Sequence, residues 1–302
     1  MPMVASRAPY TLLVSDDDIP LNPREESVSG GNADNLGTMV CWHRRYDLGD
    51  KHTYDDPADF LHSKLFELYS SYPSSEYGKP VYDFLKSGKA ESAKLEYNRS
   101  THEWELWEQW FGGKEWSKSS AYAASLKGRD IPDCFLDDCL SALNNHEMIR
   151  LLEESGRFVM LPLYLYDHSG ITMSSAPFSC PWDSGQVGWI YADGETIEKE
   201  YGEVTDEALE KARRVLSDEV ETYDYYLTGQ CYFFQLFEGD TEVDSCGGFL
   251  GDIRDIQNDL KDYLPDGYED LAEHLEYDDC GEFDINDYLE ETEETEEMDD
   301  EL

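Results

Sequence analysis

The chain has 302 residues, of which 68 are acidic and 23 are basic, and its net charge at neutral pH is −45. A field of this sign repels phosphate backbones and anionic lipids, which argues against direct binding to nucleic acid or to a membrane. Because 40% of the residues are apolar and 13% are aromatic, the sequence predicts a folded core and excludes a chain that is disordered throughout.

Residues 1–34 are rich in Asp, Ser, Pro and Gly, and they predict an irregular N-terminal arm. They show no basic segment followed by an apolar run, so we expect no signal peptide. No apolar stretch reaches the roughly 20 residues of a membrane-spanning helix. The seven cysteines are odd in number and include no CxxC pair. This pattern favours reduced thiols in a cytosolic protein over disulfides.

The next segments alternate between strand and helix patterns. Residues 35–50 predict a strand. Asp56, as a cap, and Pro57, in the first turn, predict a helix that runs through Leu68. Residues 72–133 are rich in turn residues and hold most of the lysines. They predict an insertion into the domain.

Two further patterns lie around the end of the insertion. Trp104, Trp107 and Phe111 are three and four residues apart, which predicts an amphipathic aromatic stripe that belongs to the core more often than to a binding face. A helix is predicted from Cys134 to Ser155, and Gly156 ends it.

Strand patterns dominate the second half of the chain. The apolar run at 158–170 predicts a buried strand, in which Pro162 requires an edge or a bulge. Residues 186–193 predict another strand. Thr205, as a cap, begins a helix that ends at Gly229.

The last predicted elements form a hairpin and a helix. Residues 231–239 and 242–250 predict an antiparallel pair that is joined around Gly239 and Asp240. A closing helix follows and is broken at Pro265.

These elements together predict an α+β fold with a mixed, mostly antiparallel sheet flanked by helices. The domain is expected over residues 35–262, with the insertion at about 72–133. Residues 263–302 are expected to form an acidic C-terminal extension. From Asp266 to Leu302 the chain has 19 acids and no Lys or Arg, yet the residues before this segment still hold 49 acids against 23 bases. The folded part is therefore acidic as well.

Five sequence blocks resemble a family of uncharacterised proteins encoded by bacteriophages, prophages and other mobile elements. The blocks occur in the same order and are "NLGTMVCWHRRYDLGD" at 35–50, "LPLYLYDHSG" at 161–170, "FSCPWDSGQVGWIY" at 178–191, "ETYDYYLTG" at 221–229 and "DSCGGFLGD" at 244–252. Family members usually carry aromatic residues where this chain has Gly247 and Leu250, a departure that affects packing of the last strand. No activity is assigned to the family, so the resemblance implies a phage-like origin and the host cytoplasm as the place of action.

The densest cluster of chemically active residue types lies in two of these blocks. Cys180, His168 and Asp183 are the residue types of a nucleophilic site, in which the imidazole raises the thiolate fraction and the carboxylate orients the ring. Their spacing matches no nucleophile-elbow, papain-like or caspase signature. A hydrolase that depends on these three residues is therefore kept as the alternative function.

The same blocks also have a purely structural interpretation. Residues 167–170 would form a tight turn, while Cys180 and Trp182 pack inside the protein. Gly185 and Gly188 would allow bends or a close approach of strands. A pocket for an unknown small ligand is a further alternative.

Sequence signals for metals and nucleotides are weak. Cys41 and His43 lie on one face of the predicted strand and His52 follows, but paired CxxC or HxxxH ligands are missing. The glycine-rich stretches lack the strand–loop–helix context of a phosphate loop. We therefore expect neither a metal nor a cofactor.

The C-terminal tail is the strongest candidate for a partner-binding segment. Nine of the twelve residues from Glu290 to Glu301 are acidic. A helix would place one negative charge about every 2 Å of its axis, close to the roughly 1.7 Å of duplex DNA. A disordered, solvating tail is the alternative, because like charges four residues apart oppose helix formation. The predicted partner-binding residues are Asp278, Asp279, Glu290, Glu291, Glu293, Glu294, Glu296, Glu297, Asp299 and Asp300.

Acids also alternate with aromatic residues throughout 201–289. Aromatic rings supply rigid contact area and carboxylates bind Lys and Arg, so the combination suits a protein surface that normally holds phosphates. We therefore expect a phage-type acidic inhibitor without catalytic activity, which mimics DNA. Its partner would be a host defence nuclease or another nucleic-acid-processing complex with a basic DNA-binding surface. A homo-oligomer is compatible with this function, since several copies cover a wide surface better. A salt-adapted protein of unrelated function is a second alternative.

Overall fold

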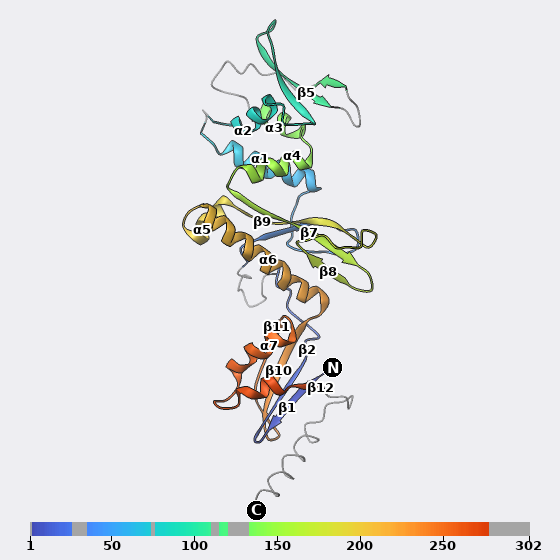
Figure 1. The fold of residues 1–302 in the computed structure, drawn as a ribbon, viewed down its shortest axis with the longest axis vertical. Coiled ribbons are helices and arrows are strands. Elements are labelled where there is room, and N and C mark those ends of the chain that lie inside the picture. Colours follow the sequence, from blue (N-terminus) through green and yellow to red (C-terminus); the bar gives the residue numbers. More distant parts are fainter. Residues whose placement is uncertain (1, 26–34, 74–75, 110–114, 120–132, 278–302) are drawn as a thin grey trace, which may run out of the picture. The chain divides into compact units, whose positions relative to one another are not determined.

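The computed structural model describes residues 2–25, 35–73, 76–109, 115–119 and 133–277 (Figure 1). It combines helices with mostly antiparallel sheets, which confirms the predicted α+β class. None of the helices in these ranges is long and apolar enough to cross a membrane. The chain divides into two compact units. Unit 1 comprises Met1–Gly37, Pro162–Val187 and Val215–Leu302, and unit 2 comprises Thr38–Leu161 and Gly188–Arg214. The predicted single domain over 35–262 therefore differs from the observed division.

The first helix of unit 2, α1 (Pro57–Ser70), begins where the sequence predicts. The Asp56 side chain accepts hydrogen bonds from the backbone N–H groups of Ala58 and Asp59 at 2.8 and 2.9 Å, and Pro57 occupies the first turn. Both features satisfy or remove N–H groups that have no partner within the helix. The helix buries its apolar stripe from Phe60 to Tyr69.

The helix predicted over 134–155 is two helices, α3 (Asp133–Ser141) and α4 (Asn145–Glu154). Asn144 has an extended backbone and forms a capping box with Glu147, which starts a new helix. Gly156 has φ +63°, as expected for the residue that follows a helix end.

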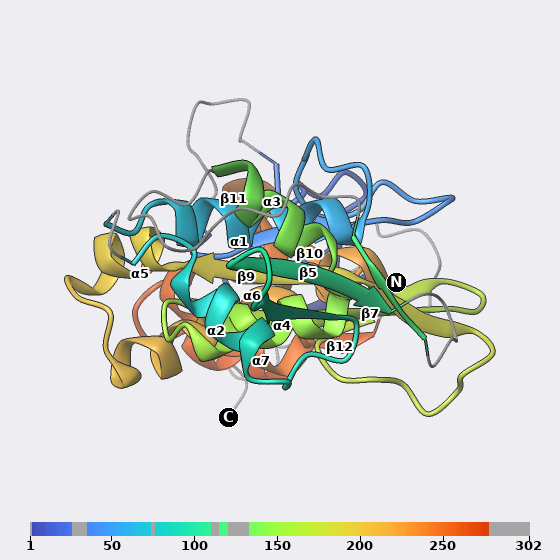
Figure 2. The same ribbon diagram turned by 90° about the horizontal axis from the view of Figure 1, so that it is seen from above.

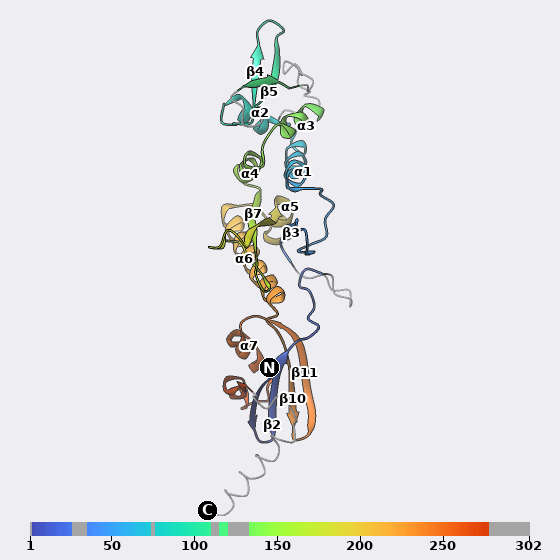
Figure 3. The ribbon, with the colours of Figure 1, turned by 90° about the vertical axis from the view of Figure 1, so that its right-hand side faces the viewer.

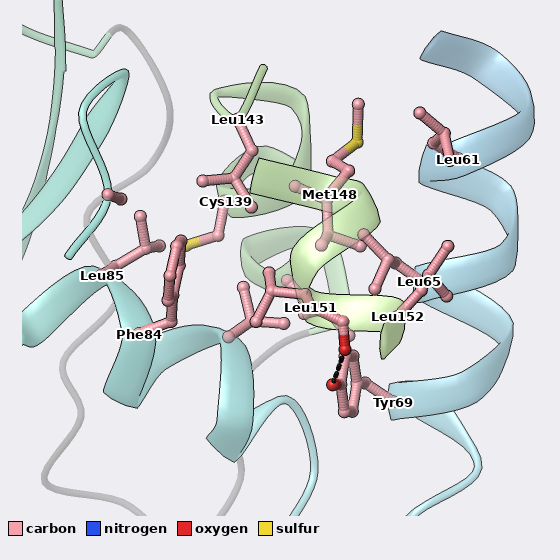
Figure 4. Packing of buried hydrophobic residues seen from close by; sticks show 14 of the residues in the cluster. Leu61, Leu65, Tyr69, Phe84, Leu85, Cys139, Leu143, Met148, Leu151 and Leu152 are labelled. Atoms are coloured by element: carbon pink, nitrogen blue, oxygen red, sulfur yellow. Dashed lines mark hydrogen bonds between the residues drawn. The ribbon is translucent and has the colours of Figure 1, made fainter. Parts of the chain in front are cut away.

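The core of unit 2 lies between these helices (Figure 4). α1 contacts both α3 and α4. Figure 2 gives the view of these elements from above. The buried hydroxyl of Tyr69 donates to the carbonyl of Leu151 at 2.9 Å, so its polar atom is satisfied inside the core. Glu147 is only 4% exposed, and it accepts hydrogen bonds from the backbone of Glu91 and Ser92. It thereby ties α4 to the segment before β4.

The insertion predicted at 72–133 contains regular structure. It forms α2 (Lys79–Lys86) and a three-stranded antiparallel sheet, β4 (Ala93–Asn98), β5 (Glu103–Gln109) and β6 (Trp116–Lys118), in the order β4-β5-β6. The predicted stripe of Trp104 and Trp107 is wrong in its geometry, because both residues belong to β5, where residues three apart face opposite sides. Phe111 lies outside the described residues.

A four-stranded sheet has the order β3-β9-β7-β8, with β3 (Thr38–Cys41), β7 (Phe158–Asp167), β8 (Ile171–Ser174) and β9 (Ser184–Asp193). The pairing of β7 with β8 runs from Tyr164 to Asp167 and leaves Pro162 outside that ladder, as a residue without an N–H group requires. After β9 come α5 (Gly194–Tyr201) and α6 (Asp206–Thr228). Thr205 caps α6 and Gly229, at φ +75°, follows its end, as predicted.

Unit 1 contains a five-stranded antiparallel sheet in the order β11-β10-β2-β1-β12. The predicted hairpin of β10 (Cys231–Glu238) and β11 (Thr241–Leu250) is confirmed. The irregular N-terminal arm is wrong, because β1 (Met3–Arg7) and β2 (Tyr10–Asp16) form a hairpin, and β2 pairs with β10. Apolar residues of β1 and β2 are buried in one core with β10, α7 (Ile253–Leu260) and the second 3₁₀ helix (Glu269–His274), all of which lie more than 200 residues further along the chain.

The first part of the predicted acidic C-terminal extension has regular structure. α7 (Ile253–Leu260), two 3₁₀ helices (Lys261–Tyr263 and Glu269–His274) and β12 (Glu276–Tyr277) belong to unit 1. α7 lies on one face of the sheet (Figure 3). Residues up to Tyr277 are therefore part of the fold, because β12 pairs with β1.

Candidate functional site

The acidic residues are distributed unequally between the two units. Unit 1 contains 39 of the 68 acids and four of the 23 bases, whereas unit 2 contains 29 acids and 19 bases. The structure describes 23 of the acids in unit 1. Four bases can neutralise only a small part of such a number, so unit 1 carries most of the excess negative charge. The four bases are Arg7, Arg24, Arg254 and Lys261.

The helical segment that covers the sheet of unit 1 is amphipathic. Ile256, Leu260, Leu264 and Leu271 are buried against the sheet and fix which side of the segment faces the core. Eight acids of the segment from Asp252 to Glu276 are exposed to solvent. We call this set the acidic layer: Asp252, Asp255, Asp259, Asp262, Asp266, Glu269, Glu273 and Glu276.

The segment that carries the acidic layer is fastened to the first hairpin of the chain through Gly267, Tyr268 and Asp270. The Arg7 guanidinium donates to the Asp270 carboxylate at 2.9 Å and to the carbonyl of Gly267. It also lies 4.1 Å from the ring centre of Tyr268, whose hydroxyl donates to the carbonyl of Ala8 at 3.2 Å. A guanidinium that binds a carboxylate and a backbone carbonyl and also lies over an aromatic ring holds its partners in a defined geometry. The carboxylates therefore stand on an ordered scaffold.

Two acids of this layer are held in their ionised form. Backbone hydrogen bonds of Glu269 and Gly267 lower the pKa of the Glu269 carboxyl. The Lys261 ammonium lies 2.6 Å from Glu273 and lowers the pKa of that carboxyl. Both groups therefore remain negative below the pH at which an ordinary glutamate takes up a proton.

The residues predicted to bind a partner in the C-terminal tail lie outside the described residues. They are Asp278, Asp279, Glu290, Glu291, Glu293, Glu294, Glu296, Glu297, Asp299 and Asp300. The ordered acids that precede them fall within residues 201–289, where the sequence predicted a partner surface without naming individual acids. The sequence pattern that could have found them is the spacing of Asp252, Asp255 and Asp259 at three and four residues, next to the apolar Ile256 and Leu260. This pattern is typical of a helix with one acidic and one apolar face.

Cys180, His168 and Asp183, the residues of the alternative hydrolase, lie together in unit 1. The Cys180 thiol donates to Oδ2 of Asp183 at 3.6 Å, and His168 Nδ1 lies 3.6 Å from the same oxygen. The carboxylate thus contacts both other groups. In a nucleophilic triad the imidazole contacts the nucleophile and the carboxylate contacts the imidazole. The side chain of His168 is also 63% exposed, so this surface does not keep water from the cluster.

The structural interpretation of the same blocks is partly confirmed. His168 N donates to the carbonyl of Gly170 at 3.0 Å and Ser169 has φ +62°, so residues 167–170 form a tight turn. The prediction that Trp182 packs inside is wrong, because this residue is 92% exposed. Trp182 lies in the loop between β8 and β9, two residues before β9 begins.

The two glycines of this segment differ. A Cβ at Gly188 would lie 1.9 Å from the Val40 carbonyl oxygen, which confirms a close approach of β3 and β9 at this position. A Cβ at Gly185 would meet nothing within 4 Å.

The histidines considered as metal ligands bind the backbone. His52 Nε2 lies 3.0 Å from the carbonyl oxygen of Cys41, and His43 Nδ1 accepts from the N–H of Tyr46 at 3.3 Å. Within the described ranges, no group of three His, Cys, Asp or Glu residues is placed to hold a metal ion.

Unit 2 contains a cavity of about 420 Å³ beside α1 and the start of α5. Its lining includes both signs of charge, with Lys64 and Arg157 facing Glu67 and Asp193. Asp193 caps α5 by accepting from the N–H of Thr196 at 3.0 Å, so this carboxylate is already used by the fold. The mixed charges do not select one class of ligand.

Comparisons with protein-family models, with curated proteins and with solved structures found no match for this chain.

Proposed function

We propose that this protein is a phage-type acidic inhibitor that occupies the basic DNA-binding surface of a host defence or nucleic-acid-processing complex. The observation that supports it best is the charge of unit 1, in which 39 acids accompany four bases. Self-repulsion of such a charge lowers stability, and a partner with the opposite charge relieves it. The inhibitor acts in the host cytoplasm and needs no chemistry of its own.

The spacing of the ordered acids supports mimicry of DNA. Asp252, Asp255 and Asp259 follow one another at three and four residues along α7 and its cap. At a rise of 1.5 Å per residue, such positions repeat about every 5 Å. One strand of DNA carries a phosphate about every 3.4 Å. The spacing of these carboxylates is therefore comparable with that of phosphates, and a row of Lys and Arg that binds phosphates can bind them as well.

The arrangement of Cys180, Asp183 and His168 does not favour the hydrolase alternative. A variant with Cys180→Ala and His168→Ala separates the two functions. If the protein is an inhibitor, this variant still binds the partner. If the protein is a hydrolase, the variant loses its activity although circular dichroism shows an unchanged fold.

Capture from a bacterial lysate tests the proposed function directly. The full chain is immobilised, the lysate is passed over it, and bound proteins are eluted with duplex DNA at constant ionic strength. Proteins that DNA displaces have their DNA-binding surface covered by this protein. Raising the salt concentration is expected to weaken the same complexes, because ions screen exposed charges. If duplex DNA releases no bound protein, the proposed function is wrong.

Charge-neutral variants then locate the binding surface. Replacing Asp255, Asp259, Asp262 and Asp266 with Asn removes four exposed carboxylates of the acidic layer. Exposed ion pairs contribute about 0.2–1 kcal/mol each, so the fourfold variant is expected to lose about 2 kcal/mol of binding free energy, or roughly thirtyfold in affinity. The control removes four exposed carboxylates of unit 2 by changing Glu153, Glu200, Glu203 and Glu210 to Gln. The affinity of each variant for the captured protein is measured by its competition with a fluorescent DNA duplex. Equal losses in the two variants would show that total charge acts without a specific surface.

A further inference from the structure

An exposed tryptophan stands in the acidic unit. Trp182 is 92% exposed, more than the other large apolar side chains that are exposed in the described ranges, such as Ile19 at 86% and Leu21 at 69%. A solvated indole leaves a large apolar surface in water, and burying it in a complex is favourable. Tryptophan is also the side chain most enriched among residues that dominate binding energies in interfaces.

The backbone around Trp182 is held in place on both sides. The carbonyl of Asp183 accepts from Asp167 N at 2.8 Å, and the Ser184 hydroxyl donates to the carbonyl of Cys180 at 2.5 Å. The Asp183 carboxylate also contacts His168 and Cys180, each at 3.6 Å. An anchor that is already positioned loses less conformational entropy on binding than a side chain on a loose loop. The contacts around Asp183 therefore have a positioning function that needs no catalysis.

The charge around the indole selects the chemistry of its partner. Trp182 lies in residues 162–187 of unit 1, which hold two acids, Asp167 and Asp183, and no Lys or Arg, and the whole unit has 39 acids and four bases. A cationic side chain is attracted to this field and also to the face of an indole. Arginine fits better than lysine, because its planar guanidinium stacks on aromatic rings and is more weakly hydrated.

We propose that Trp182 is an anchor of the partner interface, on which an arginine of the basic surface stacks. This inference rests on the proposed function and adds to it one residue and one type of contact. It also explains why an acidic inhibitor that relies on charge carries an uncovered indole on a fixed loop.

A labelled indole measures the contact at the residue itself. The full chain is labelled with ¹⁵N in its tryptophan side chains, and the Trp182 signal is assigned by its loss in Trp182→Phe. The probes are acetylated tetra-arginine amide and tetra-lysine amide at low salt. We expect tetra-arginine to shift the Trp182 signal more than those of the other six tryptophans, and to bind more tightly than tetra-lysine.

Substitutions make the test quantitative. Trp182→Ala is expected to weaken tetra-arginine binding about two- to fivefold, the size of a cation–π contact at an exposed site, and to change tetra-lysine binding less. Ile19→Ala removes a similarly exposed apolar side chain and is expected to change neither. Trp182→Phe keeps a smaller aromatic face and is expected to fall between the wild type and Trp182→Ala.

The outcomes separate this inference from the proposed function. If the wild type binds tetra-arginine and Trp182→Ala binds it equally well, the anchor is wrong and the electrostatic function stands. If the wild type binds neither peptide, the electrostatic function fails and the anchor fails with it. A Trp182 signal that shifts with protein concentration before any peptide is added would assign the indole to contacts between copies of this chain and overturn the arginine contact.

Discussion

The substitution Gly188→Ala tests the closest approach of two strands in the structure. Gly188 in β9 faces Cys41 in β3, and a Cβ at this position would lie 1.9 Å from the carbonyl oxygen of Val40. Real Cβ contacts below 3.0 Å are essentially never seen. The two strands would therefore have to separate by about 1 Å. Such a shift lengthens a normal 2.9 Å hydrogen bond beyond the range in which it contributes.

The cost follows from what the separation disturbs. β3 pairs with β9 over four residues, and Met39 and Val40 in its centre are fully buried. Forcing a methyl group into a packed site costs about 1–3 kcal/mol. A lost hydrogen bond adds about 1 kcal/mol. Replacing glycine with alanine returns about 0.5 kcal/mol through the unfolded chain. We expect the free energy of unfolding to fall by about 2.5 kcal/mol, which lowers the melting temperature by roughly 5–10 °C.

Urea unfolding followed by tryptophan fluorescence measures this loss, with Gly185→Ala as the matched control. The control carries the same substitution three residues earlier in the same strand, where a Cβ meets nothing within 4 Å. It is expected to change stability by less than about 1 kcal/mol. If the two variants unfold at the same urea concentration, the close approach of β3 to β9 is wrong.

Three further predictions concern buried or paired groups. Burial raises the pKa of the Cys231 thiol to about 11, so that roughly one molecule in a thousand carries the thiolate at pH 8. After brief iodoacetamide treatment, peptide mass spectrometry should find the exposed Cys246 modified and should find Cys231 modified only when urea is added. Glu219→Gln removes the carboxylate charge that lies 2.9 Å from the Arg24 guanidinium, whose side chain is 2% exposed, and should lower the free energy of unfolding by about 3 kcal/mol. Adding Arg24→Met should restore part of the loss, and simple additivity would contradict a direct pair. The hydrogen bond from Lys118 lowers the pKa of Glu105. The stability from this pair is therefore present above the pKa that glutamate has in the unfolded chain, and it is lost as the pH falls through the lower pKa of the folded state. Lys118→Met should raise the titration midpoint of the Glu105 carboxyl in ¹³C spectra, and an unchanged midpoint would contradict this cause.

Elements whose signals are local can be predicted from the amino-acid sequence alone. Asp56 and Pro57 mark the start of α1, and Thr205 and Gly229 bound α6, because caps and helix stops act within a few residues. The hairpin of β10 and β11 is also predicted from its turn at Gly239. The excess of acids is a property of composition and needs no fold.

Other elements depend on partners that are distant in the chain. Trp104 and Trp107 have a spacing that suits a helix, and only pairing with β4 places them in a strand. β1 lies between β2 and β12, so its order depends on residues more than 260 positions away. Local patterns carry no information about such pairing, because the favourable burial exists only after the chain has closed a long loop.

The candidate site divides in the same way. The identities of Cys180, His168 and Asp183 can be taken from the sequence, but only the tertiary structure places the carboxylate in contact with both other groups. Charge could be counted before folding, whereas its concentration in unit 1 required the division of the chain into two units. The exposure of Trp182 also depends on the tertiary structure. A side chain is buried only if the fold brings another surface against it, and the neighbouring residues in the chain do not specify that surface.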